Sequence, residues 1–101
     1  MQIMIQSIHF DADRKLIAYI QKRLEKLLTF HDNIIDANVY LKVEKSGDNN
    51  NKTLEVKLNV QNQTLFCEEH CRTFECAIDL AVESLKMQLK KYKDKLRAVN
   101  F

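Results

Sequence analysis

The sequence predicts an α+β fold, a two-layer sandwich in which a four-stranded sheet carries two helices on one face. Apolar and polar residues alternate over residues 35–43 and 54–60, as they do in half-buried strands. Apolar residues recur at helical spacing over residues 16–28 and 74–96. The chain has 101 residues, 46% of them hydrophobic, which suits a single domain over residues 1–101.

The first third of the chain predicts a strand followed by a helix. Residues 1–8 have β-type composition, with Ile3 and Ile5 on one face. Asp11 or Asp13 can cap a helix that continues to about Phe30. The apolar residues that recur along this helix are Leu16, Ile17, Ile20, Leu24, Leu27 and Leu28.

Three strands are expected next. The inward residues of the first are Ile35, Ala37, Val39, Leu41 and Val43. The polar segment 46–52 contains the only glycine and predicts a mobile hairpin loop before the strand at 54–60. A second turn at 61–63 leads to a shorter strand at 64–68, with Leu65 and Cys67 inward. We expect an antiparallel sheet with one apolar face.

The chain closes with a long amphipathic helix, most clearly over residues 77–97, for which Thr73 is a suitable N-cap. Its apolar side is formed by Phe74, Ile78, Ala81, Leu85, Leu89, Tyr92 and Leu96. The element order is therefore β-α-β-β-β-α. Both helices are expected to place their apolar stripes on the same face of the sheet and to leave its other face to water.

Charge is segregated along the chain. The net charge is only +2, but residues 82–101 carry six basic and two acidic side chains and residues 11–30 carry five and three. On the last helix, four basic residues line one edge of the apolar side, and two more lie farther from that edge around the helix. On the first helix, three basic residues lie along one edge, beside Tyr19. These residues are Lys86, Lys90, Lys93 and Arg97, then Lys91 and Lys95, and on the first helix Lys15, Lys22 and Lys26.

Segregated positive charge favours a polyanionic partner over a neutral small molecule. The competing interpretation is an ordinary solvated helix face. If the two helices pack side by side, their basic edges would merge into one patch. The aromatic residues Tyr19, Tyr40 and Phe66 can stack on nucleic-acid bases, or they can belong to the edge of the core and the surface of the sheet.

Several other classes of protein are disfavoured. No apolar run approaches the ~20 residues of a membrane span, and residues 1–10 lack the features of a secretory signal. Three cysteines crowded into ten residues resemble reduced intracellular thiols, so we expect a cytoplasmic protein. No glycine-rich phosphate loop or nucleophile motif is present, which disfavours an enzyme. We expect no cofactor and no small-molecule substrate.

Two alternatives remain open. Cys67, His70, Cys71 and Cys76 offer four soft ligands for zinc, but their spacing lacks the usual C-x₂-C pair, and Cys67 on a strand and Cys76 on a buried helix turn are more simply core residues. The other alternative is a general RNA-binding domain or a protein–protein adaptor that uses the exposed sheet face or a helix.

Three segments resemble the short ribosome hibernation promoting factors, which include the ribosome-associated inhibitors of the sigma-54 modulation protein family. These segments are LEKLLTFHDNIIDANVYLKVEK, the polar hairpin before TLEVKLNV, and AIDLAVESLKMQLKKYKDKL, which is the most specific of the three. The similarity extends over the whole chain.

This resemblance implies a fold akin to double-stranded RNA-binding domains with an added first strand. It also implies binding to ribosomal RNA of the small subunit, in the channel for messenger and transfer RNA, and silencing of translation during stress or stationary phase. The basic residues that match the family by position are Lys86, Lys90, Lys91, Lys93, Lys95, Arg97, Lys22 and Lys26, with Lys15 a weaker match.

The sequence departs from the family pattern at Ser84 and Met87, where further basic residues are common. It ends at Phe101, which resembles the short form of the family. In some bacteria short forms act with a separate ribosome modulation factor, which is a candidate partner.

Overall fold

The structure is a computed structural model that describes residues 2–29, 34–44 and 50–99, without the side chains of Leu28 and of residues 96–99. The elements are β1 (Gln2–Ile8), α1 (Arg14–Thr29), β2 (Ile34–Val43), β3 (Lys52–Val60), β4 (Gln63–Cys71) and α2 (Phe74–Val99). Their order confirms the predicted β-α-β-β-β-α fold. Phe30, most of the loop predicted at 46–52 and Phe101 lie outside the described residues.

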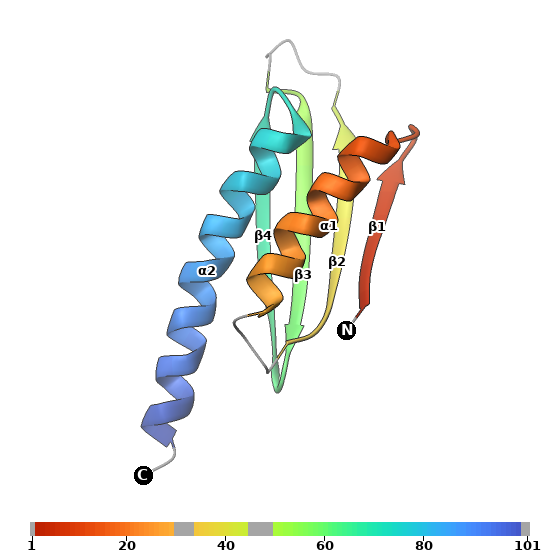
Figure 1. Ribbon diagram of the computed structural model, residues 1–101. Helices are drawn as coiled ribbons and strands as arrows, with labels where there is room; N and C mark the ends of the chain where they lie inside the picture. The colour runs from red at the N-terminus through yellow and green to blue at the C-terminus, as the bar shows by residue number, and fades with distance from the viewer. Residues whose placement is uncertain (1, 30–33, 45–49, 100–101) are drawn as a thin grey trace.

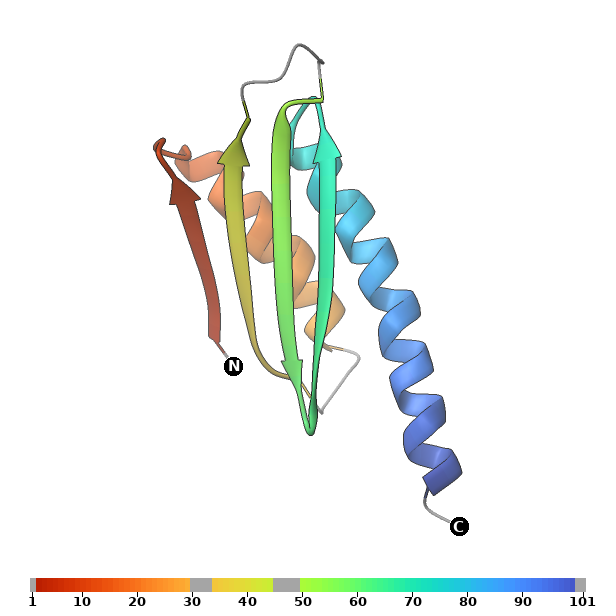
Figure 2. The same cartoon turned by 180° about the vertical axis from the view of Figure 1, so that it is seen from behind.

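The four strands form one sheet in the order β1-β2-β3-β4, and both helices cover the same face of it (Figures 1 and 2). The expectation of an antiparallel sheet was wrong at one edge, because β1 pairs with β2 in parallel. The helix α1 is long enough to return the chain to the starting end of the sheet, which a parallel neighbour requires. The pairs β2–β3 and β3–β4 are antiparallel.

This topology also sets the direction of the helices. Since β1 and β4 point the same way, α1 and α2 both begin at one end of the sheet and run toward the other (Figure 1). At 1.5 Å per residue, the 26 residues of α2 span about 15 Å more than the 16 residues of α1. The C-terminal end of α2 therefore projects beyond the sheet, and the molecule measures 51 × 25 × 18 Å.

Both helix starts are capped by side chains. The predicted cap of α1 is resolved in favour of Asp13, whose Oδ1 accepts a hydrogen bond from the Leu16 amide at 2.8 Å. Thr73 caps α2 as predicted, since its Oγ1 accepts from the Cys76 amide at 3.1 Å. Such a bond satisfies one of the backbone donors that a helix start leaves without a partner. The caps thus fix where each helix leaves the sheet.

One core lies between the sheet and the helices. The apolar side predicted for α2 is buried wherever its side chains are described, from Phe74 to Tyr92. In α1, Ile20, Leu24 and Leu27 are buried, whereas Leu16 and Ile17 are only partly so. The predicted inward residues of β4, Leu65 and Cys67, are also buried, and Ile3 and Ile5 of β1 pack against the core.

The predicted alternation in β2 was wrong at both ends of the strand. Ala37, Val39 and Leu41 are buried as expected, but Ile35 is 58% and Val43 44% exposed. The pairing of β2 with β3 shifts between Ile34 and Asp36, and this irregularity turns Ile34 inward in place of Ile35. Val43 is the last residue of the strand and pairs with Lys52, the first residue of β3, so it lies at the end of the sheet.

Candidate nucleic-acid interface

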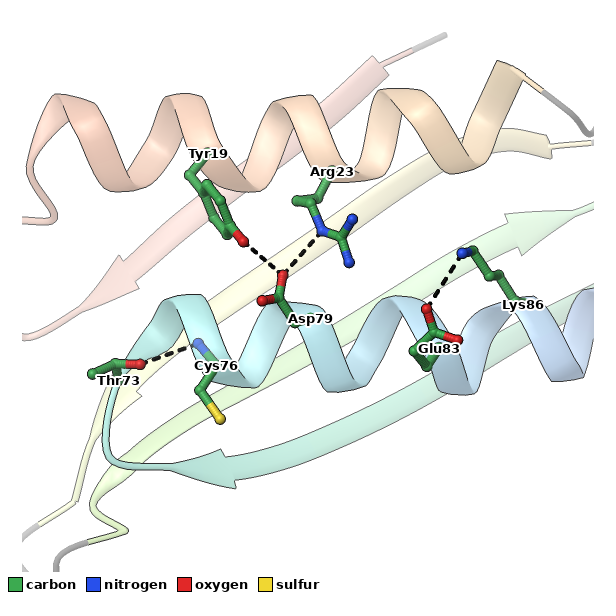
Figure 3. A network of polar contacts seen from close by, with 7 residues as sticks. All are labelled: Tyr19, Arg23, Thr73, Cys76, Asp79, Glu83 and Lys86. Atoms are coloured by element: carbon green, nitrogen blue, oxygen red, sulfur yellow. Dashed lines mark hydrogen bonds and ion pairs between the residues drawn. The ribbon is translucent and has the colours of Figure 1, made fainter.

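The two helices are joined by a polar network centred on Asp79 of α2. Its Oδ1 accepts a hydrogen bond from the Tyr19 hydroxyl at 2.8 Å and lies 3.0 Å from Nε of Arg23, both on α1 (Figure 3). The Arg23 Nε is buried and makes no well-aligned hydrogen bond, so its stabilisation comes from the ion pair. The carboxylate of Asp79 therefore holds the two helices side by side.

This network shows that Tyr19 belongs to the edge of the core, which was one of the two interpretations of this residue. Tyr19 is half-buried between the helices and its hydroxyl is used by Asp79. Tyr40 and Phe66 lie on the opposite, outer face of the sheet, where the Lys57 ammonium stands 5.8 Å from the centre of the Tyr40 ring. The three aromatic residues thus do not form one stacking surface. Sequence reasoning missed Arg23 and Asp79 because only packing between the helices gives them a role.

Asp79 also shows which way the basic residues of α2 face. Lys86 and Lys90 follow it by 7 and 11 residues, so they share its side of the helix, which is the side toward α1. Lys86 points along this side in Figure 3 and pairs with Glu83 at 3.3 Å. On α1, Lys22 and Lys26 adjoin Tyr19 and Arg23 on the helix surface. Basic residues from both helices therefore border one seam, which we call the interhelical seam.

The structure places the predicted basic side chains as follows. Lys15, Lys22, Lys26, Lys86, Lys90, Lys91 and Lys95 are exposed and Lys93 is half-buried. The side chain of Arg97 lies outside those described, although its backbone continues α2. Of these seven exposed lysines, only Lys86 makes an ion pair with another described side chain. Exposed cations of this kind keep their charge available for a partner.

Lys91 and Lys95 lie on the other flank of α2. Together with Gln88 and Tyr92 of the same helix and Gln63 and Leu65 of β4, they line a shallow hollow of about 190 Å³. The helix is held there by two hydrogen bonds to backbone carbonyls, from Tyr92 to Gln61 at 2.7 Å and from Gln88 to Phe66 at 3.0 Å. The basic residues of α2 thus flank its buried stripe on both sides.

The outer face of the sheet has a different electrostatic character. Besides His70, the strands place two lysines and three carboxylates on this face. These residues are Lys42, Lys57, Asp36, Glu55 and Glu68. Lys42 lies 3.3 Å from Glu55, which offsets part of this charge locally. The described residues of α1, in contrast, carry five basic side chains and one acidic one. Positive charge is therefore concentrated on the helical layer.

The cysteine cluster does not assemble as a metal site. Cys67 and Cys71 are buried on the inner face of the sheet, whereas His70 points outward, with its Nδ1 2.9 Å from the Thr53 hydroxyl. The expectation that Cys76 is buried was wrong, because its position in the first turn of α2 leaves it exposed. Within residues 2–29, 34–44 and 50–99, no three His, Cys, Asp or Glu side chains converge in a way that would hold a metal ion.

The hydrogen bond between the helices changes the titration of Tyr19. The bond to Asp79, followed by desolvation, raises the pKa of Tyr19 above its ordinary 10.0. A raised pKa means that the folded state holds the proton more tightly, so this stabilisation is present below pH 10.0 and is lost as the pH rises through the folded pKa. We expect alkaline unfolding above pH 10.0 to be steeper in the wild type than in Tyr19→Phe, measured by denaturant titration at several pH values. Equal slopes would contradict this assignment.

Residues 3–97 match the family described as Sigma 54 modulation protein / S30EA ribosomal protein. The chain belongs to this family. Among the curated members, it is 37% identical over 76 residues to a ribosome hibernation promotion factor from Deinococcus radiodurans, covering 74% of this chain and 40% of that protein. A ribosome hibernation promoting factor from Pseudomonas putida is 28% identical over 104 residues, which cover 98% of this chain and 93% of that one.

The fold is shared by a protein of known structure. A ribosomal subunit interface protein from Coxiella burnetii superposes with a TM-score of 0.82 at 19% identity, covering 93% of this chain and 99% of that one. The family match thus confirms the family expected from the sequence, and this superposition confirms the expected architecture. Among the described residues, no helix is both long enough and apolar enough to cross a membrane.

Proposed function

We propose that residues 1–101 act as one cytoplasmic, non-enzymatic domain that binds the small ribosomal subunit through ribosomal RNA and halts translation, as in ribosome hibernation under stress or in stationary phase. The proposal rests on the difference in charge between the helical layer and the outer sheet face, in a chain that belongs to the Sigma 54 modulation protein / S30EA family. Basic residues of α1 and α2 border the interhelical seam, whereas the outer sheet face has a slight excess of carboxylates.

The proposed binding surface comprises the predicted set: Lys15, Lys22, Lys26, Lys86, Lys90, Lys91, Lys93, Lys95 and Arg97. Lys and Arg side chains would neutralise phosphates of the RNA and release the counterions condensed on it. The parallel course of the helices brings the basic C-terminal half of α1 beside the start of the basic half of α2. A phosphate backbone lying along the seam would therefore meet cations from both helices.

Inhibition by this mechanism needs no chemical step. A folded body of 51 × 25 × 18 Å, seated in the channel for messenger and transfer RNA, would exclude both by occupying their volume. Recognition by shape and phosphate contacts suits structured RNA, because the deep groove of an A-form helix hides the edges of the bases. The projecting end of α2 offers a basic extension that can follow RNA beyond the body of the domain.

Co-sedimentation with purified small ribosomal subunits tests this proposal. We expect saturable binding that weakens as salt rises, and displacement by messenger RNA together with initiator transfer RNA. Binding whose affinity does not change with salt concentration would indicate a protein–protein adaptor instead. Salt-sensitive binding that messenger and transfer RNA do not displace would indicate a binding site outside the channel. A parallel series with a ribosome modulation factor would show whether that partner changes the stoichiometry.

The alternative of a protein–protein adaptor rests on the outer face of the sheet, where Met4 is 52% and Phe66 46% exposed. These two side chains lie on β1 and β4, the opposite edges of the sheet, with polar residues of β2 and β3 between them. They do not form a continuous apolar patch of the kind that marks a protein interface. The outer sheet face therefore offers an adaptor no continuous apolar docking patch, which favours ribosomal RNA over a protein partner at this face.

A further inference from the structure

Two cysteines flank the turn that joins the sheet to the last helix. Cys71 is the final residue of β4 and Cys76 lies in the first turn of α2. The Thr73 cap fixes the turn between them, through its bond to the Cys76 amide at 3.1 Å. Cys71 is buried and Cys76 is exposed. One thiol of the pair is thus open to solvent while the other is sheltered behind it.

The two thiols are close enough to affect each other's ionisation. Burial, and after it hydrogen bonding and charge interaction with the Cys76 thiol, raise the pKa of Cys71 to about 11. In Figure 3 the sulfur of Cys76 projects from α2 on the side of β4. The contact therefore joins a strand end to a helix start, two elements whose relative position the Thr73 cap already holds.

The third cysteine is not an alternative partner for Cys71. Cys67 lies four residues earlier on the same strand, so its Cα is about 13 Å from that of Cys71, well beyond the ~7 Å that a disulfide spans. It is buried, and its thiol lies 3.6 Å from Oε1 of Glu69. Cys67 therefore serves as an internal control with the same chemistry and a different position.

We propose that Cys71 and Cys76 form a redox couple, which closes into a reversible intramolecular disulfide when the folded protein meets a low-molecular-weight disulfide. In this couple Cys76 is the accessible attacking thiol and Cys71 is the resolving thiol. The modification is independent of the proposed ribosomal function, because it requires only the turn between β4 and α2.

The reaction proceeds by two thiol–disulfide exchanges. The Cys76 thiolate attacks one sulfur of glutathione disulfide, which forms a mixed disulfide and expels one glutathione thiolate. The Cys71 thiolate then attacks the Cys76 sulfur, closes the protein disulfide and expels the second glutathione thiolate. The two protein thiols give up two electrons and two protons, and the products are one protein disulfide and two molecules of glutathione.

The position of both cysteines at one short turn favours the second exchange over arrest at the mixed disulfide. Once Cys76 is bonded to glutathione, its thiol no longer raises the pKa of Cys71, although burial, the largest cause, and the charge of Glu69 continue to raise it. The reacting sulfurs also belong to one short turn, which gives the step a high effective concentration. Closure would tie the first turn of α2 to β4.

Peptide mapping of the folded protein after incubation with glutathione disulfide tests the couple. Trypsin cleaves after Arg72, between the two cysteines, and a glutamate-specific protease cleaves after Glu68 and Glu69, between Cys67 and Cys71. We expect the Cys71 and Cys76 peptides to be recovered as one cross-linked species that a dithiol reductant separates, with the intact protein lighter by two hydrogen atoms. Cys67 should remain a free thiol.

Three variants distinguish the proposed roles. Cys71→Ser should stop at a mixed disulfide on Cys76, and Cys76→Ser should react at least tenfold more slowly, because both remaining thiols are buried. Cys67→Ser should form the disulfide at the wild-type rate. Accumulation of the mixed disulfide on Cys76 in the wild type, with Cys71 still free, would overturn the proposal, as would a cross-link that includes Cys67.

Discussion

A double substitution at the interhelical seam, Lys22→Gln with Lys90→Gln, is expected to weaken binding to the small ribosomal subunit by roughly 10- to 100-fold at moderate salt. The two lysines come from different helices and border the same seam. If each neutralises one phosphate, the slope of log affinity against log salt should fall by about 1.4–1.8. Co-sedimentation across a salt series measures both quantities.

The outer sheet face supplies a matched control for this experiment. Lys42→Gln with Lys57→Gln removes the same charge from the same protein, but at positions on β2 and β3 that face away from the helices. We expect this variant to keep the wild-type salt slope. A control that loses as much affinity as the seam variant would mean that overall charge, or the sheet face itself, governs binding.

The largest effect on stability is expected from Leu85→Ala. Leu85 lies in the middle of α2 and is fully buried against the sheet. Removal of a buried leucine side chain costs the lost transfer energy and leaves a cavity, together about 2–5 kcal/mol. The change should lower the Tm by about 10–20 °C in a domain of this size. Denaturant and thermal unfolding followed by circular dichroism measure the loss.

Met87 provides the control for this substitution on the same helix. It lies two residues after Leu85 on the opposite side of α2 and is 66% exposed. Met87→Ala should change the free energy of unfolding by no more than about 0.5 kcal/mol. Similar losses for the two variants would contradict the assigned orientation of α2 on the sheet.

Local sequence patterns were sufficient to predict the elements and most of the core. The caps at Asp13 and Thr73 and the buried side of α2 follow from side-chain chemistry and helical periodicity, which act within a few residues. The same reasoning failed at Ile35, because a register shift against β3 depends on the partner strand and leaves no local mark. It failed at Cys76 because one turn of helix does not show which side meets the sheet.

The basic residues were also visible in the sequence, but their arrangement was not. Helical spacing placed Lys86 and Lys90 on one edge of α2 and Lys91 and Lys95 farther round. The contacts of Asp79 with Tyr19 and Arg23 show that the first edge faces α1, and the hollow beside β4 shows where the second lies. Neither relation could be derived from one helix alone.

The sequence by itself determined the order of the elements, the family, the amphipathic side of each helix and the segregation of positive charge, because all of these depend on neighbouring residues and their spacing. Only the tertiary structure decided that β1 runs parallel to β2, that both helices run in the same direction, and that Asp79 joins them. These features arise from contacts between residues far apart in the chain, as with the 60 positions that separate Tyr19 from Asp79. Such contacts bring two separate basic segments to the border of one seam.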